Sequence, residues 1–522
     1  MSKIRHMRGF LTSCPGVSPL AACSIGVAFA TVVALAPAGS AVAGTPAGSA
    51  AVGVSTGSAV GASAGSVTAG SAIPGSTRSL PLGPLSRERA LGAAPEQGLY
   101  RTGLARFALV GVVWDDPATE LHGRVQVRTR SAATGEWSGW QDVETHNTDH
   151  GADTGAAERS SGRVHGGTAP LWVGDSDGVD VRVRADGAGE ARGARGTRAG
   201  GLRSALPSGL RLELVDPGEG TGETEGAGEP EQAERAAAVK GVAQVGEAVR
   251  DAGEAVPGDL PADDPPRTAL DTEAALAASA ANADITDFGS YAIPELDRQA
   301  TERELARLQV PGIQDPARAK PYIGPRPRIV TRRGWGADES LREHGFVYTK
   351  TIKAAFVHHT ATGNKYTCAQ APSVIRGIYR YHVKSMGWRD IGYNFLVDKC
   401  GTLYEGRAGG VAKAVLGAHT LGFNTNSMGI AVIGTYTTTK PAGGTVTAVA
   451  RLTAWKLGLY GVNPRGKTYL TSGGGNLYPK GKNVRLNVIS GHRDGYATEC
   501  PGKRLYARLG TARSSAAKYQ GR

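Results

Sequence analysis

The sequence predicts an α/β protein in which a mixed central β-sheet flanked by helices forms the C-terminal domain. A smaller all-β, sandwich-like domain and disordered linkers are expected to precede it. Three observations support this prediction: short alternating apolar runs between residues 99 and 215, alternating strand and helix patterns after residue 353, and two segments whose composition does not suit a packed core. Hydrophobic residues make up 40% of the 522, which excludes a wholly disordered chain.

Residues 1–43 have the three parts of a cleavable secretory signal. Lys3, Arg5 and Arg8 form a basic start, residues 25–36 are apolar, and residues 41–43 are small. A membrane anchor is the alternative, although its apolar stretch is short. Residues 20–23 resemble a lipoprotein box, but the apolar segment follows its cysteine rather than preceding it. We therefore expect a secreted protein, extracellular or associated with the cell wall, without stable membrane insertion after cleavage.

Residues 44–94 are rich in Gly, Ser and Ala and predict a disordered leader. Residues 95–215 predict a β-rich domain of unknown role, with strand patterns at 107–114, 125–128, 179–183 and 210–214. Trp137 and Trp140 lie in this domain. Their rings could stack on sugars, but such tryptophans are more often half-buried strand residues.

Charge divides the rest of the chain. Residues 216–325 form an Ala/Gly/Pro-rich predicted linker, and 216–300 hold 19 acidic against 5 basic residues. Residues 326–522 hold 30 basic against 8 acidic residues, a net charge of +22. Such a charge favours a polyanionic partner, and the export signal favours anionic cell-wall polymer over nucleic acid. An ordinary solubilising surface is the alternative.

The C-terminal block predicts buried strands at 354–358, 393–397 and 428–433, with helices at 374–386 and 446–459. In such α/β units functional groups gather at the ends of parallel strands. Two histidines occupy these positions: His358 closes the first strand, and His492 follows the apolar run at 486–491.

Cysteine usage adds a third candidate ligand. Signal cleavage would remove Cys14 and Cys23 and leave three cysteines, an odd number. One disulfide and one thiolate held by another group, such as a metal, is the simplest arrangement outside the cell. Two imidazoles and a thiolate can bind zinc and leave its fourth position open for catalysis. By spacing alone this signal is weak, because isolated histidines are more often structural.

Six ordered motifs strengthen the prediction of a metal site. They are Phe356-Val357-His358-His359-Thr360, Gly387-Trp388-Arg389-Asp390-Ile391-Gly392-Tyr393-Asn394-Phe395, Tyr404-Glu405-Gly406-Arg407, Gly417-Ala418-His419-Thr420, Gly491-His492-Arg493-Asp494 and Thr498-Glu499-Cys500-Pro501-Gly502. With them, residues 328–510 resemble the peptidoglycan recognition protein family and the related N-acetylmuramoyl-L-alanine amidases of type 2. The resemblance places an amidase domain at 326–522.

The resemblance implies a zinc site and a reaction. His358, His492 and Cys500 would ligate Zn²⁺, and Tyr393 would be the catalytic tyrosine that donates to the developing oxyanion. Thr498 stands where phage enzymes have a lysine, so it cannot supply a cation. His359 should point to the opposite face of its strand, because neighbouring strand residues alternate.

The resemblance also implies substrate contacts. His382, Asn394 and His419 match positions at the substrate cleft. Gly387, Trp388 and Arg407 match relatives that bind diaminopimelate-type stem peptides, whose extra carboxylate a guanidinium can pair bidentately. With Cys500 committed to zinc, Cys368 and Cys400 remain to form a disulfide.

Two functions from different classes follow, and a third places the activity elsewhere. The first is a secreted zinc amidase that cleaves between the lactyl group of N-acetylmuramic acid and L-Ala of peptidoglycan. The second is a protein that binds peptidoglycan or muropeptides without cutting them, and Cys500 argues against it, because non-catalytic relatives typically lose this ligand. In the third, the 95–215 domain is the main functional unit and binds carbohydrate or anchors the wall.

Overall fold

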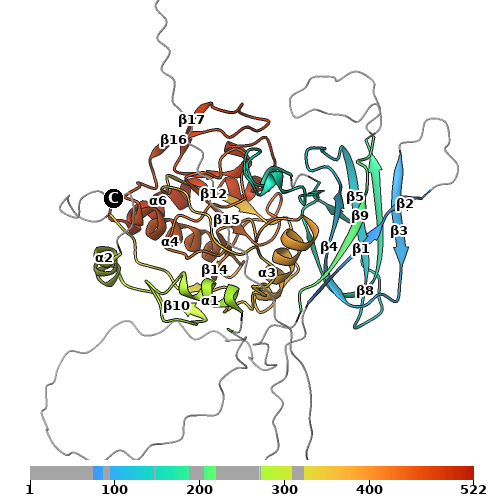
Figure 1. Cartoon of the computed structure of the whole chain (residues 1–522), viewed down its shortest axis with the longest axis horizontal. Coiled ribbons are helices and arrows are strands. Elements are labelled where there is room, and N and C mark those ends of the chain that lie inside the picture. Colours follow the sequence, from blue (N-terminus) through green and yellow to red (C-terminus); the bar gives the residue numbers. More distant parts are fainter. Residues whose placement is uncertain are drawn as a thin grey trace, which may run out of the picture. The chain divides into compact units, whose positions relative to one another are not determined.

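The computed structural model describes residues 75–85, 95–145, 148–186, 205–218, 270, 272–308 and 322–522. The predicted signal peptide, most of the predicted leader and the central part of the predicted linker lie outside the described residues. Within the described part of the chain, no helix is both long and apolar enough to cross a membrane. Figure 1 shows a β domain followed along the chain by an α/β domain.

The β domain confirms the predicted all-β, sandwich-like architecture. Its nine strands are connected in one sheet, in which the first half of the long strand β8 pairs with β4 and the second half lies between β3 and β5. Strands β1 and β9 extend the β4 side. The strands are β1 Ser76–Pro81, β2 Gly83–Pro84, β3 Glu96–Arg101, β4 Phe107–Trp114, β5 Gly123–Ser131, β6 Gln141–Val143, β7 Gly166–Gly167, β8 Leu171–Ala185 and β9 Arg211–Asp216.

Strands β1 and β2 lie inside the segment predicted to be a disordered leader, so the structure differs from that prediction between residues 76 and 84. β1 pairs along its whole length with β9, where Leu80 faces Leu212. Only Leu80 in β1 is a large apolar residue. The strand pattern is therefore too weak to recognise locally, because pairing with a strand more than 100 residues away stabilises it.

The α/β domain is built on a seven-stranded mixed sheet in the order β10-β11-β14-β13-β15-β12-β18. β13, β15, β12 and β18 are parallel neighbours, whereas β14 runs antiparallel to β13 and β10 antiparallel to β11. A separate hairpin contains β16 and β17. The strands are β10 Ala292–Ile293, β11 Ile329–Val330, β12 Ala354–His359, β13 Phe395–Val397, β14 Leu403–Glu405, β15 Ser427–Val432, β16 Lys467–Thr471, β17 Asn483–Asn487 and β18 Ile489–Gly491.

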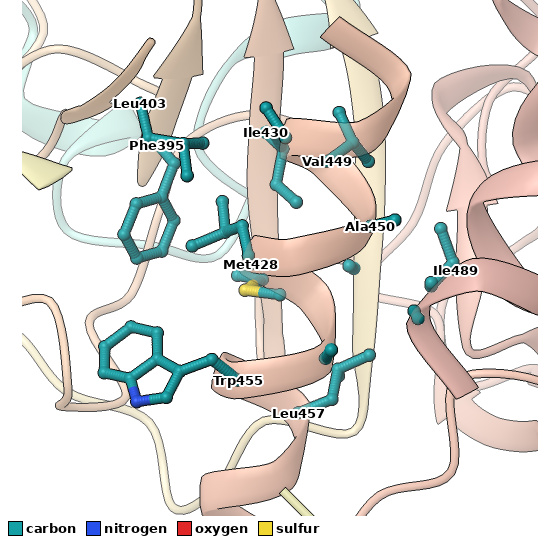
Figure 2. Close-up of a cluster of buried hydrophobic side chains, with 14 of the residues drawn as sticks. Phe395, Leu403, Met428, Ile430, Val449, Ala450, Trp455, Leu457 and Ile489 are labelled. Carbon is teal, nitrogen blue, oxygen red and sulfur yellow. The ribbon is translucent and has the colours of Figure 1, made fainter. Parts of the chain in front are cut away.

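Helices cover both faces of this sheet because its strand residues alternate in direction. Met428 and Ile430 of β15 pack with Val449 and Trp455 of α4 (Gly443–Leu459), as Figure 2 shows. Ala431, which follows Ile430 and points to the opposite face, packs instead with the helix α3 (Ala371–Arg380). α6 (Leu509–Tyr519) lies beside α4, and α5 covers Lys503–Tyr506. The predicted α/β fold class is thus confirmed.

The predicted acidic linker contains structure at its C-terminal end. α1 (Glu273–Ala280) and α2 (Arg298–Arg307) flank β10, which extends the central sheet. The side-chain amide of Asn282, just after α1, donates a hydrogen bond to each carboxylate oxygen of Glu405, both at 3.0 Å. The acidic composition that indicates a solvated linker therefore does not apply to 272–308, because specific tertiary contacts with the sheet hold this part.

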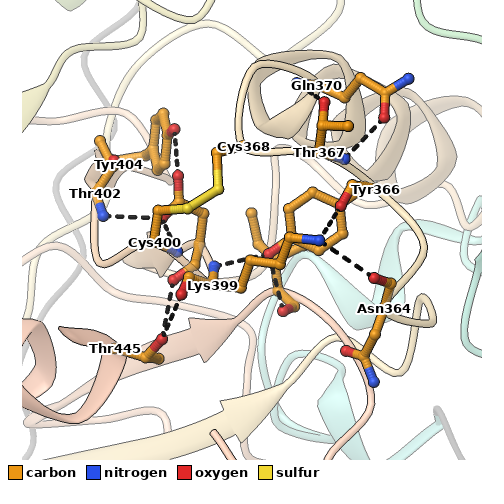
Figure 3. The surroundings of a disulfide bond; sticks show 12 residues. Asn364, Tyr366, Thr367, Cys368, Gln370, Lys399, Cys400, Thr402, Tyr404 and Thr445 are labelled. Carbon is orange, nitrogen blue, oxygen red and sulfur yellow. Dashed lines mark hydrogen bonds between the residues drawn. A yellow bond between two sulfur atoms is a disulfide. The ribbon is translucent and has the colours of Figure 1, made fainter. Parts of the chain in front are cut away.

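A disulfide joins Cys368, just before α3, to Cys400, just after β13 (Figure 3). Lys399 reinforces the same junction, since its backbone amide donates to the Tyr366 hydroxyl at 2.8 Å. Asp398 accepts from the Tyr404 hydroxyl at 2.9 Å. The bridge therefore fixes the start of α3 against the central sheet.

The β domain and the α/β domain share one core around α3. Leu109 and Trp172 of the β domain belong to the same buried cluster as Val374 and Ile378 of α3. The chain after α3 continues as a π-helical turn, Tyr381–Ser385, where the Tyr381 hydroxyl donates to the Thr168 carbonyl at 2.9 Å. These contacts bring loops of the β domain to the strand ends where the candidate ligands lie.

Candidate metal and substrate-binding site

Parallel pairing brings the predicted ligands together. His358 lies at the C-terminal end of β12, and His492 follows directly on β18, which pairs in parallel with β12. Cys500 lies in the loop before α5. All three side chains are inaccessible to solvent. The ends of neighbouring parallel strands meet at one edge of a sheet, which is why residues more than 130 positions apart converge here.

A fourth side chain, His150 from the β domain, joins them. The candidate ligand atoms of His150, His358, His492 and Cys500 all lie within 4.8 Å of one another. Cys500 Sγ is 3.6 Å from His150 Nε2 and 3.8 Å from His358 Nδ1. Three imidazoles and one thiol at these separations are a donor set typical of zinc.

The second nitrogen of each imidazole supports this assignment. His358 Nε2 lies 3.4 Å from the Thr420 hydroxyl, His492 Nε2 donates to the Asp149 carbonyl at 3.2 Å, and His150 Nδ1 lies 2.9 Å from Asp149 Oδ1. His492 Nδ1 is buried without a hydrogen-bond partner. Metal-ligating histidines characteristically have one nitrogen on the ion and the other on an oxygen, so this site fits a metal ion.

Burial sets the charge state of the ligands. It lowers the pKa of His358 well below the usual value, and the neighbouring His492 and His150 lower it further. Burial also lowers the pKa of His492, to about 3, although the Asp149 carboxylate opposes the change. Burial raises the pKa of Cys500 far above its ordinary value. A neutral imidazole has an unprotonated nitrogen that can coordinate a cation, and a bound cation would favour the thiolate form of Cys500.

Tyr393 lies immediately before β13, with its ring centroid 5.6 Å from that of His358. Burial raises the pKa of its hydroxyl well above 10, and the nearby Cys500 and Asp149 act in the same direction. The hydroxyl therefore remains protonated over the physiological range and can act as a hydrogen-bond donor. Thr498 is half-buried, and its hydroxyl accepts from the Cys500 amide at 3.3 Å.

The predicted substrate residues lie around this centre in different roles. The His382 ring stacks near Trp388 with centroids 4.4 Å apart, and His382 Nδ1 accepts from the Gly392 amide. His419 lies 5.3 Å from the His358 ring, centroid to centroid. Asn394 bonds the backbone at both ends of its amide, donating to Val415 and accepting from Gly429. It therefore holds neighbouring strands in place.

Arg407 and Gly387 both contact residues of the β domain. Arg407 follows β14 and is 5% exposed; its Nε donates to the Ile391 carbonyl at 2.9 Å. Its two terminal nitrogens each donate to Glu158 at 2.9 Å. Gly387 has a φ of +71°, and a Cβ at this position would overlap the Arg163 carbonyl. The Arg407 guanidinium thus already holds a carboxylate.

Sequence reasoning missed the contribution of the β domain to this site. Asp149, His150 and Glu158 come from the chain between β6 and β7, whose described residues 144–145 and 148–165 are hereafter called the β6–β7 loop. His150 has no motif spacing to the other ligands, being 208 residues before His358. A histidine and two acidic residues outside any predicted strand or motif carry no recognisable signal, because only the tertiary fold places them here.

His359 points away from the cluster, as strand alternation requires. Its Nδ1 accepts from the Tyr436 amide at 3.3 Å, and its Nε2 lies 3.4 Å from a carboxylate oxygen of Glu144, in the β6–β7 loop. The structure therefore gives His359 packing contacts and separates it from the four candidate ligands.

The fold and the buried donor set define an α/β domain with a candidate metal site at the ends of parallel strands. A family model described as N-acetylmuramoyl-L-alanine amidase matches residues 348–503. A second, described as Rv3811 N-terminal galactose-binding domain-like, matches residues 66–201.

Curated relatives match the same C-terminal region. Peptidoglycan-recognition protein SC2 of Drosophila simulans is 30% identical over 183 residues, which is 35% of this chain and 85% of the relative. Peptidoglycan-recognition protein SC1a/b of the same species is 34% identical over 189 residues, with the same coverage. The solved structure of Drosophila PGRP-LB is 26% identical and covers 35% of this chain and 92% of that one, with a TM-score of 0.28. This chain belongs to the peptidoglycan recognition and type 2 amidase family.

Proposed function

We propose that the protein is a secreted, zinc-dependent N-acetylmuramoyl-L-alanine amidase. It hydrolyses the amide between the lactyl group of N-acetylmuramic acid and L-Ala in peptidoglycan, with stem peptides of the diaminopimelate type. The convergence of His358, His492 and Cys500 beside Tyr393 is the observation that carries the proposal. The family model and the named relatives support peptidoglycan as the substrate class.

The chain's own residues take distinct roles in this reaction. His358, His492 and Cys500 would hold the zinc ion, which would supply Lewis-acid polarisation of the scissile carbonyl and activation of water at neutral pH. Tyr393, protonated because it is buried, donates to the oxygen on which negative charge develops. Thr498 contributes no cation. Arg407 pairs with the carboxylate that distinguishes diaminopimelate from lysine.

A non-catalytic peptidoglycan-binding protein is the second candidate, because the relatives are named for recognition. The buried Cys500, facing His358, favours the enzyme. Burial alone raises the pKa of the Cys500 thiol, and a cation bound between its sulfur and the neighbouring imidazole nitrogens would stabilise the thiolate. The strongly basic α/β domain suits a wall that also carries anionic polymers, and we propose no nucleic-acid partner.

Digestion of purified diaminopimelate-type wall tests the proposal directly. We expect the mature protein to release stem peptides with a free L-Ala amino group, detected by mass spectrometry, and we expect a chelator to abolish this release and added zinc to restore it. Release that is unaffected by exhaustive chelation would refute the metal mechanism. Fragments cut in the glycan instead of at L-Ala would refute the assigned bond.

Cys500→Ser provides the matched variant, because a hydroxyl is a much poorer zinc ligand than a thiolate. We expect bound zinc and amidase activity to fall together, by at least about tenfold each, while muropeptide binding survives. Zinc is measured by elemental analysis of the purified variant.

An exported protein whose N-terminus begins after residue 43 would support secretion, and retention of residues 1–43 would argue for the membrane anchor.

A further inference from the structure

The β6–β7 loop contributes residues both to the ligand cluster and to the surroundings of Arg407. The Asp149 carbonyl accepts from the Leu421 amide at 2.9 Å, and Asp153 accepts from the Gly422 amide and the Asn424 side chain, both at 2.7 Å. The loop ends at His165, whose amide donates to the Met386 carbonyl at 3.0 Å. Backbone and side-chain hydrogen bonds therefore hold the described part of the loop against the α/β domain.

His150 occupies the place where a fourth ligand would bind. Its ring centroid lies 4.4 Å from that of His492 and 5.9 Å from that of Tyr393, and its side chain is almost fully buried. Its Nδ1 is paired with Asp149, which leaves Nε2 directed at the ligand cluster. A catalytic zinc needs an open fourth position for water or substrate, and four protein ligands are typical of a closed site.

Glu158 makes the second contact of the loop. Its two oxygens accept from both terminal nitrogens of Arg407, and one also accepts from the Arg389 amide at 3.2 Å. Both side chains of the pair are more than nine-tenths buried. A guanidinium has two edges that can bind a carboxylate bidentately. Glu158 uses the edge formed by the two terminal nitrogens, and the Nε of the other edge donates to the Ile391 carbonyl, so neither edge is free for a second carboxylate.

A cavity of about 340 Å³ lies beside the loop. Its lining includes Ala156 and Glu158 of the loop together with Arg407 and Leu416 of the α/β domain. The loop therefore forms part of the wall of the cavity next to Arg407.

We propose that the β6–β7 loop is an internal pseudosubstrate: His150 fills the fourth coordination position of the metal, and Glu158 takes the place of the stem-peptide carboxylate on Arg407. This inference rests on the proposed function, because it assigns the blocked positions to the same site. A muropeptide must displace both contacts before it can bind in the cleft. The apparent affinity equals the intrinsic affinity multiplied by the fraction of molecules in which the loop is open.

Zinc coordination in the full-length wild-type protein tests the first half without any variant. We expect X-ray absorption at the zinc edge to show three imidazoles and one sulfur, and His150→Ala to show two imidazoles, one sulfur and one oxygen. His122→Ala, which removes an exposed histidine of the same domain, should keep the wild-type pattern. Two imidazoles and an oxygen ligand in the wild-type protein would overturn the assignment of His150.

Muropeptide binding tests the second half. We expect Glu158→Ala to bind a diaminopimelate-type muropeptide at least about tenfold more tightly than the wild type, measured by calorimetry. Glu136→Ala, an exposed glutamate in the same domain, should bind like the wild type. A lysine-type muropeptide, which lacks the extra carboxylate, should gain less. Unchanged or weaker binding by Glu158→Ala would overturn the pseudosubstrate.

The His150→Ala/Glu158→Ala double variant separates this inference from the proposed function. Faster wall digestion together with tighter binding supports both. Tighter binding without any digestion supports the loop as a blocking segment and refutes the amidase. Digestion and binding equal to the wild type refute the loop's role and leave the amidase standing. Loss of zinc from a variant that remains folded by circular dichroism would show that His150 builds the site, and would overturn the inference.

Discussion

At the scale of single residues, Tyr393 connects a physical property to a chemical role. It is buried beside His358, and burial keeps its hydroxyl protonated. His358, His492 and Cys500 are the proposed metal ligands. Among the sequence-predicted catalytic residues, only Tyr393 offers a buried hydrogen-bond donor beside them. Its contribution can be measured separately from metal binding, because it is not itself one of the four clustered donors.

For Tyr393→Phe we expect retained zinc and a loss of about 10²-fold in turnover, since one oxyanion donor is removed from a dry site. Steady-state kinetics on a soluble muropeptide and elemental analysis of zinc provide the two measurements. Tyr469→Phe, which removes an exposed hydroxyl on β16, is the matched control and should behave like the wild type. A wild-type rate in Tyr393→Phe would remove the proposed donor role.

The residue scale also shows what sequence reasoning could and could not reach. His358, His492 and Cys500 could be proposed because each lies in a recognisable motif at a strand end or loop. His150 and Glu158 could not, because their role depends on a β domain whose loop reaches the site through the fold alone. Asn394 bonds the backbone of two neighbouring segments, and its contact with the substrate stays a prediction.

At the scale of elements, the Cys368–Cys400 bridge fixes α3 to the sheet. The two cysteines are separated by 32 residues. On the chain-entropy model a loop of this length stabilises the folded state by about 3–4 kcal/mol.

For the Cys368→Ser/Cys400→Ser variant we expect the free energy of unfolding to fall by about 3–4 kcal/mol in denaturant titrations. Reductant should destabilise the wild type towards the same value and leave the variant unchanged. If the wild type and the variant unfold at the same denaturant concentration without reductant, the bridge contributes no stability.

Glu405 links the segment after α1 to strand β14 and gives a second element-scale prediction. Burial raises its pKa to about 7, although Asn282 and Arg332 act in the opposite direction. A carboxyl whose pKa is higher in the folded state contributes stability that is fully present below its unfolded pKa of 4.5 and is lost as pH rises through about 7.

We therefore expect the wild type to lose up to about 3 kcal/mol relative to Glu405→Gln between pH 4.5 and pH 7.5, measured by denaturant titration at each pH. The variant's absolute stability is not the test, because glutamine alters the hydrogen bonds with Asn282. Glu136→Gln, at an exposed position, should run parallel to the wild type. If the Glu405→Gln curve also runs parallel, the Glu405 carboxyl does not titrate in this range.

The elements themselves were predicted unevenly. Strands β12 and β15 and helix α4 have continuous apolar patterns and were found close to their observed bounds. β1, α1 and α2 were missed because their segments are polar, small or acidic, and long-range partners stabilise them. Local composition does not record such partners.

At the scale of the whole molecule, the β domain and the α/β domain share a core cluster instead of meeting at a wet surface. Leu109 of β4 is fully buried in that cluster with α3 residues of the other domain. Domains that share buried apolar contacts lose them together, so we expect the described part of the chain to unfold in one cooperative transition.

For Leu109→Ala we expect one transition that is lower by about 2–5 kcal/mol, because a buried leucine leaves a cavity. Tryptophan fluorescence reports on both domains in the same titration, because Trp172 lies in the β domain and Trp335 in the α/β domain. Leu276→Ala, at an exposed position on α1, is the control and should change stability little. Two separate transitions, only one of them shifted by Leu109→Ala, would contradict the shared core.

The whole-molecule arrangement was the least predictable feature. Composition and pattern correctly indicated two folded domains of different class, yet no residue pattern indicated that they pack together. The apolar faces of β4 and α3 are each explained locally as core, and the sequence does not tell which surfaces share that core.

The Glu158–Arg407 pair has a consequence for how a ligand must be presented. A carboxylate tethered to its own receptor acts at a high effective concentration, so a single dissolved fragment competes poorly with it. A polymer displays many stem peptides near one protein molecule, so one of them can reach the site each time Glu158 dissociates from Arg407. Polymeric wall would therefore be engaged in preference to its own soluble breakdown products, even though both carry the same chemical group.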